Sequence, residues 1–136
     1  MKAKNIYTLL LVLSIALCFS CNKEVEEPEP DPREVITGSW FCDQRELGDT
    51  VISTFKVTVS IIEGTNDGLN LSNFGNLHGS AKGYLNGDKV DIPEQYVNSF
   101  WTRGNGNIFN KYQSNWVYSI VISGDTIDYI GGFKPI

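Results

Sequence analysis

The sequence has few of the side chains from which catalytic and metal sites are usually built. Among its 136 residues there is one histidine, His78, and of the three cysteines only Cys42 lies beyond the first 21 residues. A lone cysteine forms no intramolecular disulfide, and one histidine without a cysteine pair does not make a usual structural zinc site. No serine stands in the Gly-x-Ser-x-Gly pattern of a nucleophile elbow. We therefore expect no metal, no cofactor and no catalytic residue, with His78 exposed on a loop.

Positive charge is scarce as well. The chain has 11 lysines and arginines against 16 acids, a formal net charge of −5, and its basic residues form no stripe. Binding to nucleic acid depends on clustered lysines and arginines that neutralise phosphates, and contact with anionic lipid headgroups depends on similar clusters. The composition therefore argues against a nucleic-acid partner and against direct binding of the folded part to anionic lipid.

The sequence also lacks an apolar run long enough to cross a bilayer, which takes about 20 residues. The apolar run at residues 6–19 follows Lys2 and Lys4 and ends just before Ser20 and Cys21. A positive start followed by a short apolar run is typical of a secretory signal peptide. The junction resembles a lipobox, in which a small residue precedes the cysteine that receives a lipid. The resemblance implies that the residues before Cys21 are removed and that Cys21 is lipidated.

An acidic, proline-rich segment, residues 21–34, follows the predicted signal peptide of residues 1–20. Its first acids, in residues 23–27, resemble the export signal of lipoproteins in Bacteroides-type Gram-negative bacteria. This resemblance implies an outer-membrane lipid anchor with the chain facing the cell exterior; the periplasmic face is the alternative. Because proline removes backbone donors and extends its neighbours, we expect an extended tether without secondary structure. The folded domain is then expected to occupy residues 35–136.

Beyond the tether the sequence shows no helical stripe of useful length, but it alternates repeatedly between apolar and polar residues. In residues 55–61, four apolar side chains alternate with three polar ones, and residues 116–122 carry a second apolar face. A period of two indicates half-buried strands. Further strands are expected at residues 37–42, 69–74, 81–85, 88–92, 107–109 and 126–130.

Residues that tolerate positive φ separate these strands. The best hairpin signal is Asn86-Gly87, and Ser123-Gly124 gives a second. Pro93 is expected to end the strand that follows Asn86-Gly87, because proline cannot donate to a strand ladder. About eight short antiparallel strands with local connections predict an all-β fold, a small up-and-down barrel; a two-sheet β-sandwich is the alternative.

Two short patterns resemble known families of β-proteins. Gly38-Ser39-Trp40 resembles the Gly-x-Trp of the lipocalin-like (calycin) barrels, in which the tryptophan closes one end of the barrel. Asn73-Phe74 followed by Ile92-Pro93-Glu94-Gln95 resembles small all-β domains of surface lipoproteins from Bacteroides-type bacteria. The resemblance covers most of residues 35–136 and implies a barrel fold, but it brings no activity with it.

The stretch of residues 100–116 is rich in aromatic residues and surrounds a glycine-rich segment at residues 103–107. The segment lacks the Gly-Lys-Ser/Thr ending of a phosphate-binding loop. We expect residues 103–107 to form a mobile hairpin loop, and we expect Phe109 and Trp116 to fill the core of the barrel.

Four residues of the same stretch make up the candidate binding surface. Aromatic faces stack on sugar rings while polar side chains hydrogen-bond the hydroxyls. Binding residues also concentrate on loops carried by rigid scaffolds. We expect Trp101 to present an exposed ring beside Arg103, and we predict a ligand-binding surface formed by Trp101, Arg103, Asn105 and Tyr112.

Thr50 and Thr126 are candidate sites of O-glycosylation. Asp49-Thr50-Val51 and Asp125-Thr126-Ile127 resemble the Asp-Ser/Thr-aliphatic acceptor of the same bacteria. The alternative is that both are turn-to-strand sequences, since glycine and aspartate before threonine favour a turn.

Three functions fit these observations. The first is a non-catalytic binding or interaction module on the cell surface, with glycan as the expected ligand class. The second is a hydrolase of surface glycans or peptides that uses turn carboxylates. The third is an accessory subunit of an envelope complex. We favour the first. The lipid anchor would attach the protein to the membrane, and a glycan or an envelope protein would be its partner.

Overall fold

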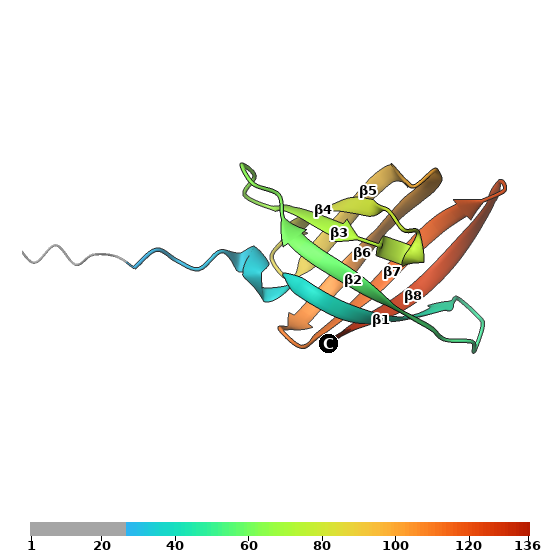
Figure 1. Cartoon of the computed structure of the whole chain (residues 1–136), viewed down its shortest axis with the longest axis horizontal. Coiled ribbons are helices and arrows are strands. Elements are labelled where there is room, and N and C mark those ends of the chain that lie inside the picture. Colours follow the sequence, from blue (N-terminus) through green and yellow to red (C-terminus); the bar gives the residue numbers. More distant parts are fainter. Residues whose placement is uncertain (1–26) are drawn as a thin grey trace, which may run out of the picture. The chain divides into compact units, whose positions relative to one another are not determined.

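The computed structural model describes residues 27–136, and Figure 1 shows their arrangement. The predicted signal peptide and Cys21 lie outside the described residues. Residues 27–30 have no regular secondary structure, and the folded unit comprises Asp31–Ile136. Within the described range, no helix has the length and apolar character required of a membrane span.

Eight antiparallel strands form a closed barrel in which each strand pairs with its neighbours in sequence, and β8 pairs with β1 to close the ring (Figure 1). The predicted up-and-down barrel is confirmed, and the two-sheet sandwich is excluded. Closure leaves no free sheet edge. In chain order the strands are β1 (Gly38–Glu46), β2 (Ser53–Ile61), β3 (Gly68–Ser72), β4 (Ser80–Asn86), β5 (Lys89–Val97), β6 (Phe100–Asn110), β7 (Gln113–Ile122) and β8 (Asp125–Pro135).

Tight turns set the register of the hairpins. Ser123 and Gly124, both with positive φ, connect β7 to β8, as a two-residue hairpin turn requires. The predicted turn at Gly87 is confirmed, because Asn86 pairs with Lys89 across it. Asn98 and Ser99 also adopt positive φ and join β5 to β6. Asparagine tolerates this backbone region better than most residues, so Asn98 was the available sequence signal for this third turn.

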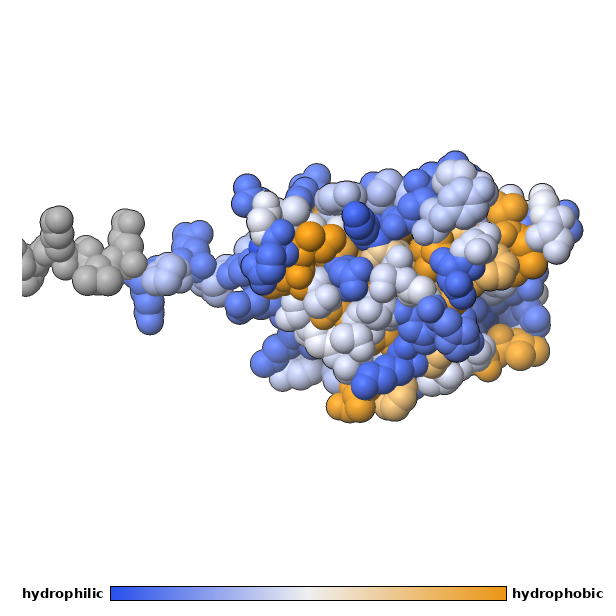
Figure 2. Space-filling view, turned by 45° about the horizontal axis from the view of Figure 1, so that its top comes forward, coloured by the Kyte–Doolittle hydropathy of each residue, from blue (hydrophilic) through white to orange (hydrophobic). Residues whose placement is uncertain are grey.

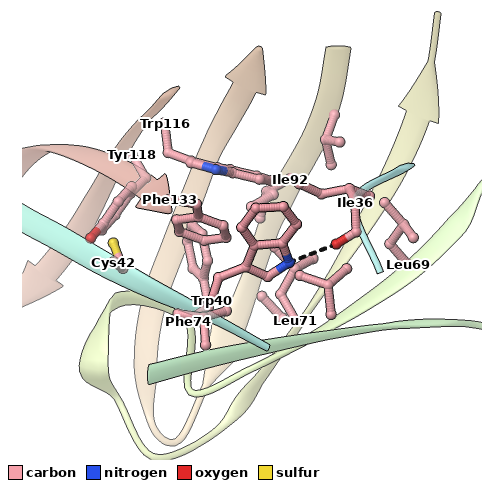
Figure 3. Packing of buried hydrophobic residues seen from close by; sticks show 14 of the residues in the cluster. Ile36, Trp40, Cys42, Leu69, Leu71, Phe74, Ile92, Trp116, Tyr118 and Phe133 are labelled. Carbon is pink, nitrogen blue, oxygen red and sulfur yellow. Dashed lines mark hydrogen bonds between the residues drawn. The ribbon is translucent and has the colours of Figure 1, made fainter. Parts of the chain in front are cut away.

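Apolar side chains fill the interior of the barrel. Trp116 stacks on Phe133 with 4.8 Å between ring centroids, and Phe74 packs against Trp116 and Tyr118 at 5.9 and 4.7 Å. All four residues are buried (Figure 3). Because an eight-stranded barrel is just wide enough for side chains to fill, these rings occupy the space that a ligand would need in a wider barrel.

A short 3-10 helix, η1 (Pro32–Val35), lies at the end of the barrel where β1 begins. The Trp40 Nε1 atom donates to the Ile36 carbonyl oxygen at 2.8 Å, and both side chains are buried (Figure 3). Trp40 therefore helps to close this end, as the lipocalin-like resemblance implied. At the opposite end, η2 (Phe74–Asn76) follows β3 and places the Phe74 ring in the core.

Arg33 connects η1 to the loop between β2 and β3. Its Nη1 atom donates to the carbonyl oxygens of Ile62 and Gly68 at 3.4 and 3.3 Å, and its Nη2 atom lies 2.6 Å from Asp31 Oδ2. Hydrogen bonds from the Arg33 side chain and backbone lower the pKa of Asp31 to about 2. The last residues of the predicted tether therefore differ from the expectation of no secondary structure, because Asp31 and Arg33 find partners there.

Two local predictions were wrong. Pro93 does not end its strand: β5 continues to Val97 through an irregularity between Ile92 and Gln95, where the pairing with β6 shifts register. A bulge of this kind tolerates proline because its residue need not donate to the ladder. The Gln95 side chain bonds the backbone of Lys82 through its Oε1 and Nε2 atoms, at 2.8 and 2.7 Å, which ties this part of β5 to β4.

The expected mobile loop at residues 103–107 is also wrong, because these residues form the middle of β6. A Cβ atom at Gly104 would lie 2.4 Å from the Cβ of Tyr118, and one at Gly106 would lie 2.6 Å from Cε3 of Trp116. Both glycines face the interior beside the large rings of β7. Glycine occupies both positions because the side chains of Tyr118 and Trp116 fill the adjacent space. The two glycines therefore do not indicate a flexible segment.

Candidate functional site

The four predicted binding residues line hollows in the outer surface of the barrel. Figure 2 shows that hydrophilic residues cover much of one face of the domain, with apolar residues in separate patches. Trp101, Arg103 and Asn105 all point outward from β6. The structure therefore brings three of the four predicted binding residues into one row. Tyr112, in the turn after β6, lies at the other end of that strand.

Trp101 forms an exposed aromatic pair with Tyr96 of β5. The two residues are register partners, and their ring centroids are 3.9 Å apart at an angle of 36°. Trp101 is 38% exposed and Tyr96 is 60% exposed, so the expectation of an exposed Trp101 ring is confirmed. At a centroid distance of 3.9 Å the two rings lie face to face. The pair, here called the aromatic platform, projects from the outside of a rigid sheet and leaves exposed aromatic surface that suits contact with a ring-shaped ligand.

A hollow of about 210 Å³, here called the Trp101 hollow, lies beside this platform. A second hollow of about 430 Å³ shares Arg103, Glu94 and Ser119 with it and adds Asn105. The Trp101 hollow is lined by Glu94, Trp101, Thr102, Arg103, Ser119, Val121 and Thr126.

Arg103 supplies the free cation of this surface. Within residues 27–136 the ion pairs are Asp31–Arg33 and Asp43–Lys134, and Arg103 takes part in neither. Its guanidinium therefore keeps its donors for solvent or for a ligand. Opposite Arg103 on β7 lies Ser119, whose hydroxyl donates to Asp128 Oδ1 at 2.6 Å. This bond orients the serine oxygen as an acceptor at the rim of the hollow.

Tyr112 lines a separate hollow of about 390 Å³ with Asn115, Lys134 and Asp43. The Lys111 ammonium lies 5.0 Å from the centroid of the Tyr112 ring, within the range of a cation–π contact. Tyr112 is 61% exposed. The predicted set of four residues is thus divided between two places on the barrel surface.

Of the two aromatic residues predicted to fill the core, one is buried and the other is exposed. Trp116 is fully buried, and its Nε1 atom donates to the buried Ser114 Oγ at 2.9 Å, which confirms the prediction. Phe109 is 59% exposed, so the prediction that it fills the core is wrong. Phe109 falls on the same outward face of β6 as Trp101, because alternate residues of a strand share a face.

The part of the chain that the structure describes holds one histidine, His78, and one cysteine, Cys42. His78 is exposed on the loop before β4, as expected, and its backbone N–H donates to Asn73 Oδ1 at 3.0 Å. Cys42 is buried beside Tyr118, and burial is the main cause that raises the pKa of its thiol to about 12. A thiol that stays protonated is a poor nucleophile. No group of three metal-ligating side chains occurs in the described part of the chain.

Thr50 and Thr126, the candidate glycosylation sites, are both exposed. Thr50 lies in the loop between β1 and β2, where the Asp49 carboxylate accepts hydrogen bonds from the backbone N–H groups of Thr50 and Val51. This is the turn geometry that aspartate favours on its own account. Modification at either threonine stays a prediction.

Sequence reasoning missed Tyr96, Glu94 and Ser119 as members of this surface. Tyr96 comes opposite Trp101 only because β5 continues past Pro93, and the bulge between Ile92 and Gln95 carries Glu94 to the hollow. Register across a bulge depends on tertiary pairing and leaves no local pattern in the sequence. No known protein family matches the chain, and no curated protein matches it either.

Proposed function

We propose that the protein is a surface lipoprotein whose barrel is a non-catalytic binding module, and that it binds glycan on the outer surface around Trp101. The observation that carries the proposal is the Tyr96–Trp101 pair beside an unpaired Arg103. An aromatic platform flanked by a multivalent donor is the combination that stacks on a sugar ring and hydrogen-bonds its hydroxyls. Asn105 and Ser119 add further polar atoms along the same surface.

The filled interior supports an external site. Trp116, Tyr118, Phe74 and Phe133 occupy the middle of the barrel, and the hollows beside the candidate residues open on its outer face. The module therefore differs from barrels that enclose a small ligand, and an external surface suits a long polymer better than a buried cavity would. Glycans of the cell surface or its surroundings are such polymers.

The proposed anchor rests on the sequence. Residues 1–20 have the order of a signal peptide, Cys21 follows a small residue, and residues 21–34 are acidic. Labelled fatty acid should enter the wild-type protein and fail to enter Cys21→Ser. Protease added to intact cells should then remove the domain; protection until the outer membrane is lysed would place it on the periplasmic face.

Trp101→Ala tests the proposed function directly. We expect this substitution to weaken binding to the best ligand on a glycan array by about tenfold, because it removes the larger ring of the platform. Tyr84→Ala is the matched control, since Tyr84 is an outward-facing ring on β4 with a similar exposure of 40%. The melting temperature of both variants is measured in parallel.

The outcomes separate the alternatives. Weaker binding by Trp101→Ala alone, with its melting temperature unchanged, supports the surface site. Binding of no glycan by the wild type, combined with co-purification of an envelope protein, would favour the accessory-subunit function instead. Turnover of a glycan or peptide substrate would favour the hydrolase.

A further inference from the structure

The outer face of the barrel is interrupted at Gly132. Across three neighbouring strands, Asn115 of β7 pairs with Gly132 of β8, and Gly132 pairs with Asp43 of β1. Asn115 and Asp43 carry outward side chains, whereas Gly132 carries none. Adjacent strands are about 4.8 Å apart, so the two walls stand about 10 Å apart over a floor of bare backbone. We call this feature the Gly132 groove.

Gly132 has no structural reason to be glycine. A Cβ atom built on it would have one neighbour within 4 Å, Asn115 Oδ1 at 3.9 Å, and its φ is not positive. The adjacent Gly131 is different, because its Cβ would lie 3.1 Å from the buried Cys42 sulfur. Glycine inside a strand costs stability, since it adds chain entropy to the unfolded state and offers no side chain to pack. The fold explains Gly131 and leaves Gly132 unexplained.

The walls of the groove hold complementary polar groups. Lys134 Nζ lies 2.6 Å from Asp43 Oδ2, and Thr54 Oγ1 donates to Asp43 Oδ1 at 2.6 Å. Each carboxylate oxygen still has a second lone pair, and the Asn115 amide offers both donors and an acceptor. Tyr112 supplies an aromatic face in the same hollow of about 390 Å³. This volume falls within the range of small-ligand sites.

The charges of the groove select among ligand classes. Asp43 disfavours an anion on its wall, and Lys134 disfavours a cation, while the two together leave the wall close to neutral. A ligand with many neutral groups that both donate and accept hydrogen bonds matches this arrangement. A sugar ring has such hydroxyls around its edge and an apolar face that Tyr112 can cover.

We infer that the Gly132 groove, between Asn115 and Asp43 and beside Tyr112, is a second binding site for a neutral sugar ring. Its ligand class rests on the proposed glycan-binding function, whereas its position rests on the Gly132 geometry alone. It lies across β7, β8 and β1, apart from the Trp101 hollow on β5 to β8.

Gly132→Thr tests this site because it fills the floor and leaves the residues of the walls unsubstituted. The full chain, purified in detergent, is applied to an array of neutral oligosaccharides, and the affinity for the best ligand is then measured. We expect at least tenfold weaker binding together with an unchanged or higher melting temperature, because threonine suits a strand better than glycine. Ser60→Thr is the matched control, since Ser60 faces outward on β2 away from the groove. Asn115→Ala should also weaken binding.

Each outcome decides the inference. Wild-type affinity in Gly132→Thr overturns it; should that variant melt lower, Gly132→Ala replaces it, and wild-type affinity there overturns the inference equally. Weaker binding in Trp101→Ala but not in Gly132→Thr overturns the second site and leaves the proposed function standing. Weaker binding in Gly132→Thr but not in Trp101→Ala supports the Gly132 groove and excludes the Trp101 hollow as a binding site. Binding of none of the neutral oligosaccharides by the wild type overturns the ligand class for both.

Discussion

The inner and outer faces of β6 follow opposite rules. On the inner face, Gly104 and Gly106 are reduced to backbone so that Tyr118 and Trp116 of β7 fit beside them. On the outer face of the same strand, Trp101 and its neighbours stand in solvent with full side chains. The middle of this strand therefore carries small residues inside and larger residues outside, the reverse of the usual pattern, whereas Ile108 near its end is a core residue of the ordinary kind. Adjacent strands therefore share the interior volume: the rings of β7 fill the space that the glycines of β6 leave open.

Of the substitutions that probe the two faces, Trp116→Ala is expected to have the largest effect on the free energy of unfolding. The indole is fully buried and stacked on Phe133, so its removal leaves a cavity that β6 cannot fill through Gly106. Removal of a buried Trp typically lowers the free energy of unfolding by about 3–5 kcal/mol. Phe109→Ala, on the outer face of β6, should change it by no more than about 0.5 kcal/mol. Urea unfolding measures both, and similar losses in the two variants would show that the buried and the exposed ring contribute equally to stability.

Gly106→Ala should have an intermediate effect. The added Cβ would lie 2.6 Å from Cε3 of Trp116, so the ring or the strand must move. Overpacking of this kind costs about 1–3 kcal/mol of unfolding free energy. Asn105→Ala is the neighbouring control, because Asn105 points outward and should lose little. A Gly106→Ala protein as stable as the wild type would show that the Trp116 ring has room that the packing does not indicate.

Much of the barrel could be predicted because half-buried strands alternate. Residues 55–61 show the period of two clearly, and they lie within β2. The turn at Gly87 was evident from its residue types. The alternation of β6 was hidden, because its inward positions include glycines instead of large apolar residues. Nothing local reveals that Trp116 and Tyr118 of another strand supply the missing volume.

The candidate site was predictable in its residue types but only partly in its grouping. Trp101 and Arg103 share a hollow because they are two residues apart on one strand, a relation that survives the mistaken loop prediction. Tyr112 was grouped with them by sequence distance, although the strand carries it to the opposite end. The open floor at Gly132 depends on strand pairing, which sequence distance does not give.

The smallest expected effect on stability concerns a charged pair at one end of the barrel, between its interior and its outer surface. Asp31 and Arg33 form the ion pair at the η1 end of the barrel, with the Arg33 side chain buried. Hydrogen bonds from Arg33 lower the pKa of Asp31 from 3.8 to about 2. A carboxyl group whose pKa is lower in the folded protein stabilises the fold above its unfolded pKa, and this contribution is lost as the pH falls through the folded pKa. Stability should therefore fall between about pH 4 and pH 2.

Asp31→Asn separates this charge from the rest of the domain. The variant should be less stable than the wild type at pH 7 and should lose less stability between pH 4 and pH 2, because its side chain does not titrate. Asp43→Asn is the control: Lys134 also lowers the pKa of Asp43, but that pair lies on the exposed face, where salt bridges contribute little. Urea midpoints at several pH values provide the measurement. Parallel pH profiles for the wild type and Asp31→Asn would show that the ion pair at the η1 end can break without unfolding of the barrel. The Asp31–Arg33 pair would then contribute as little to stability as a pair on the outer face, although Arg33 is buried.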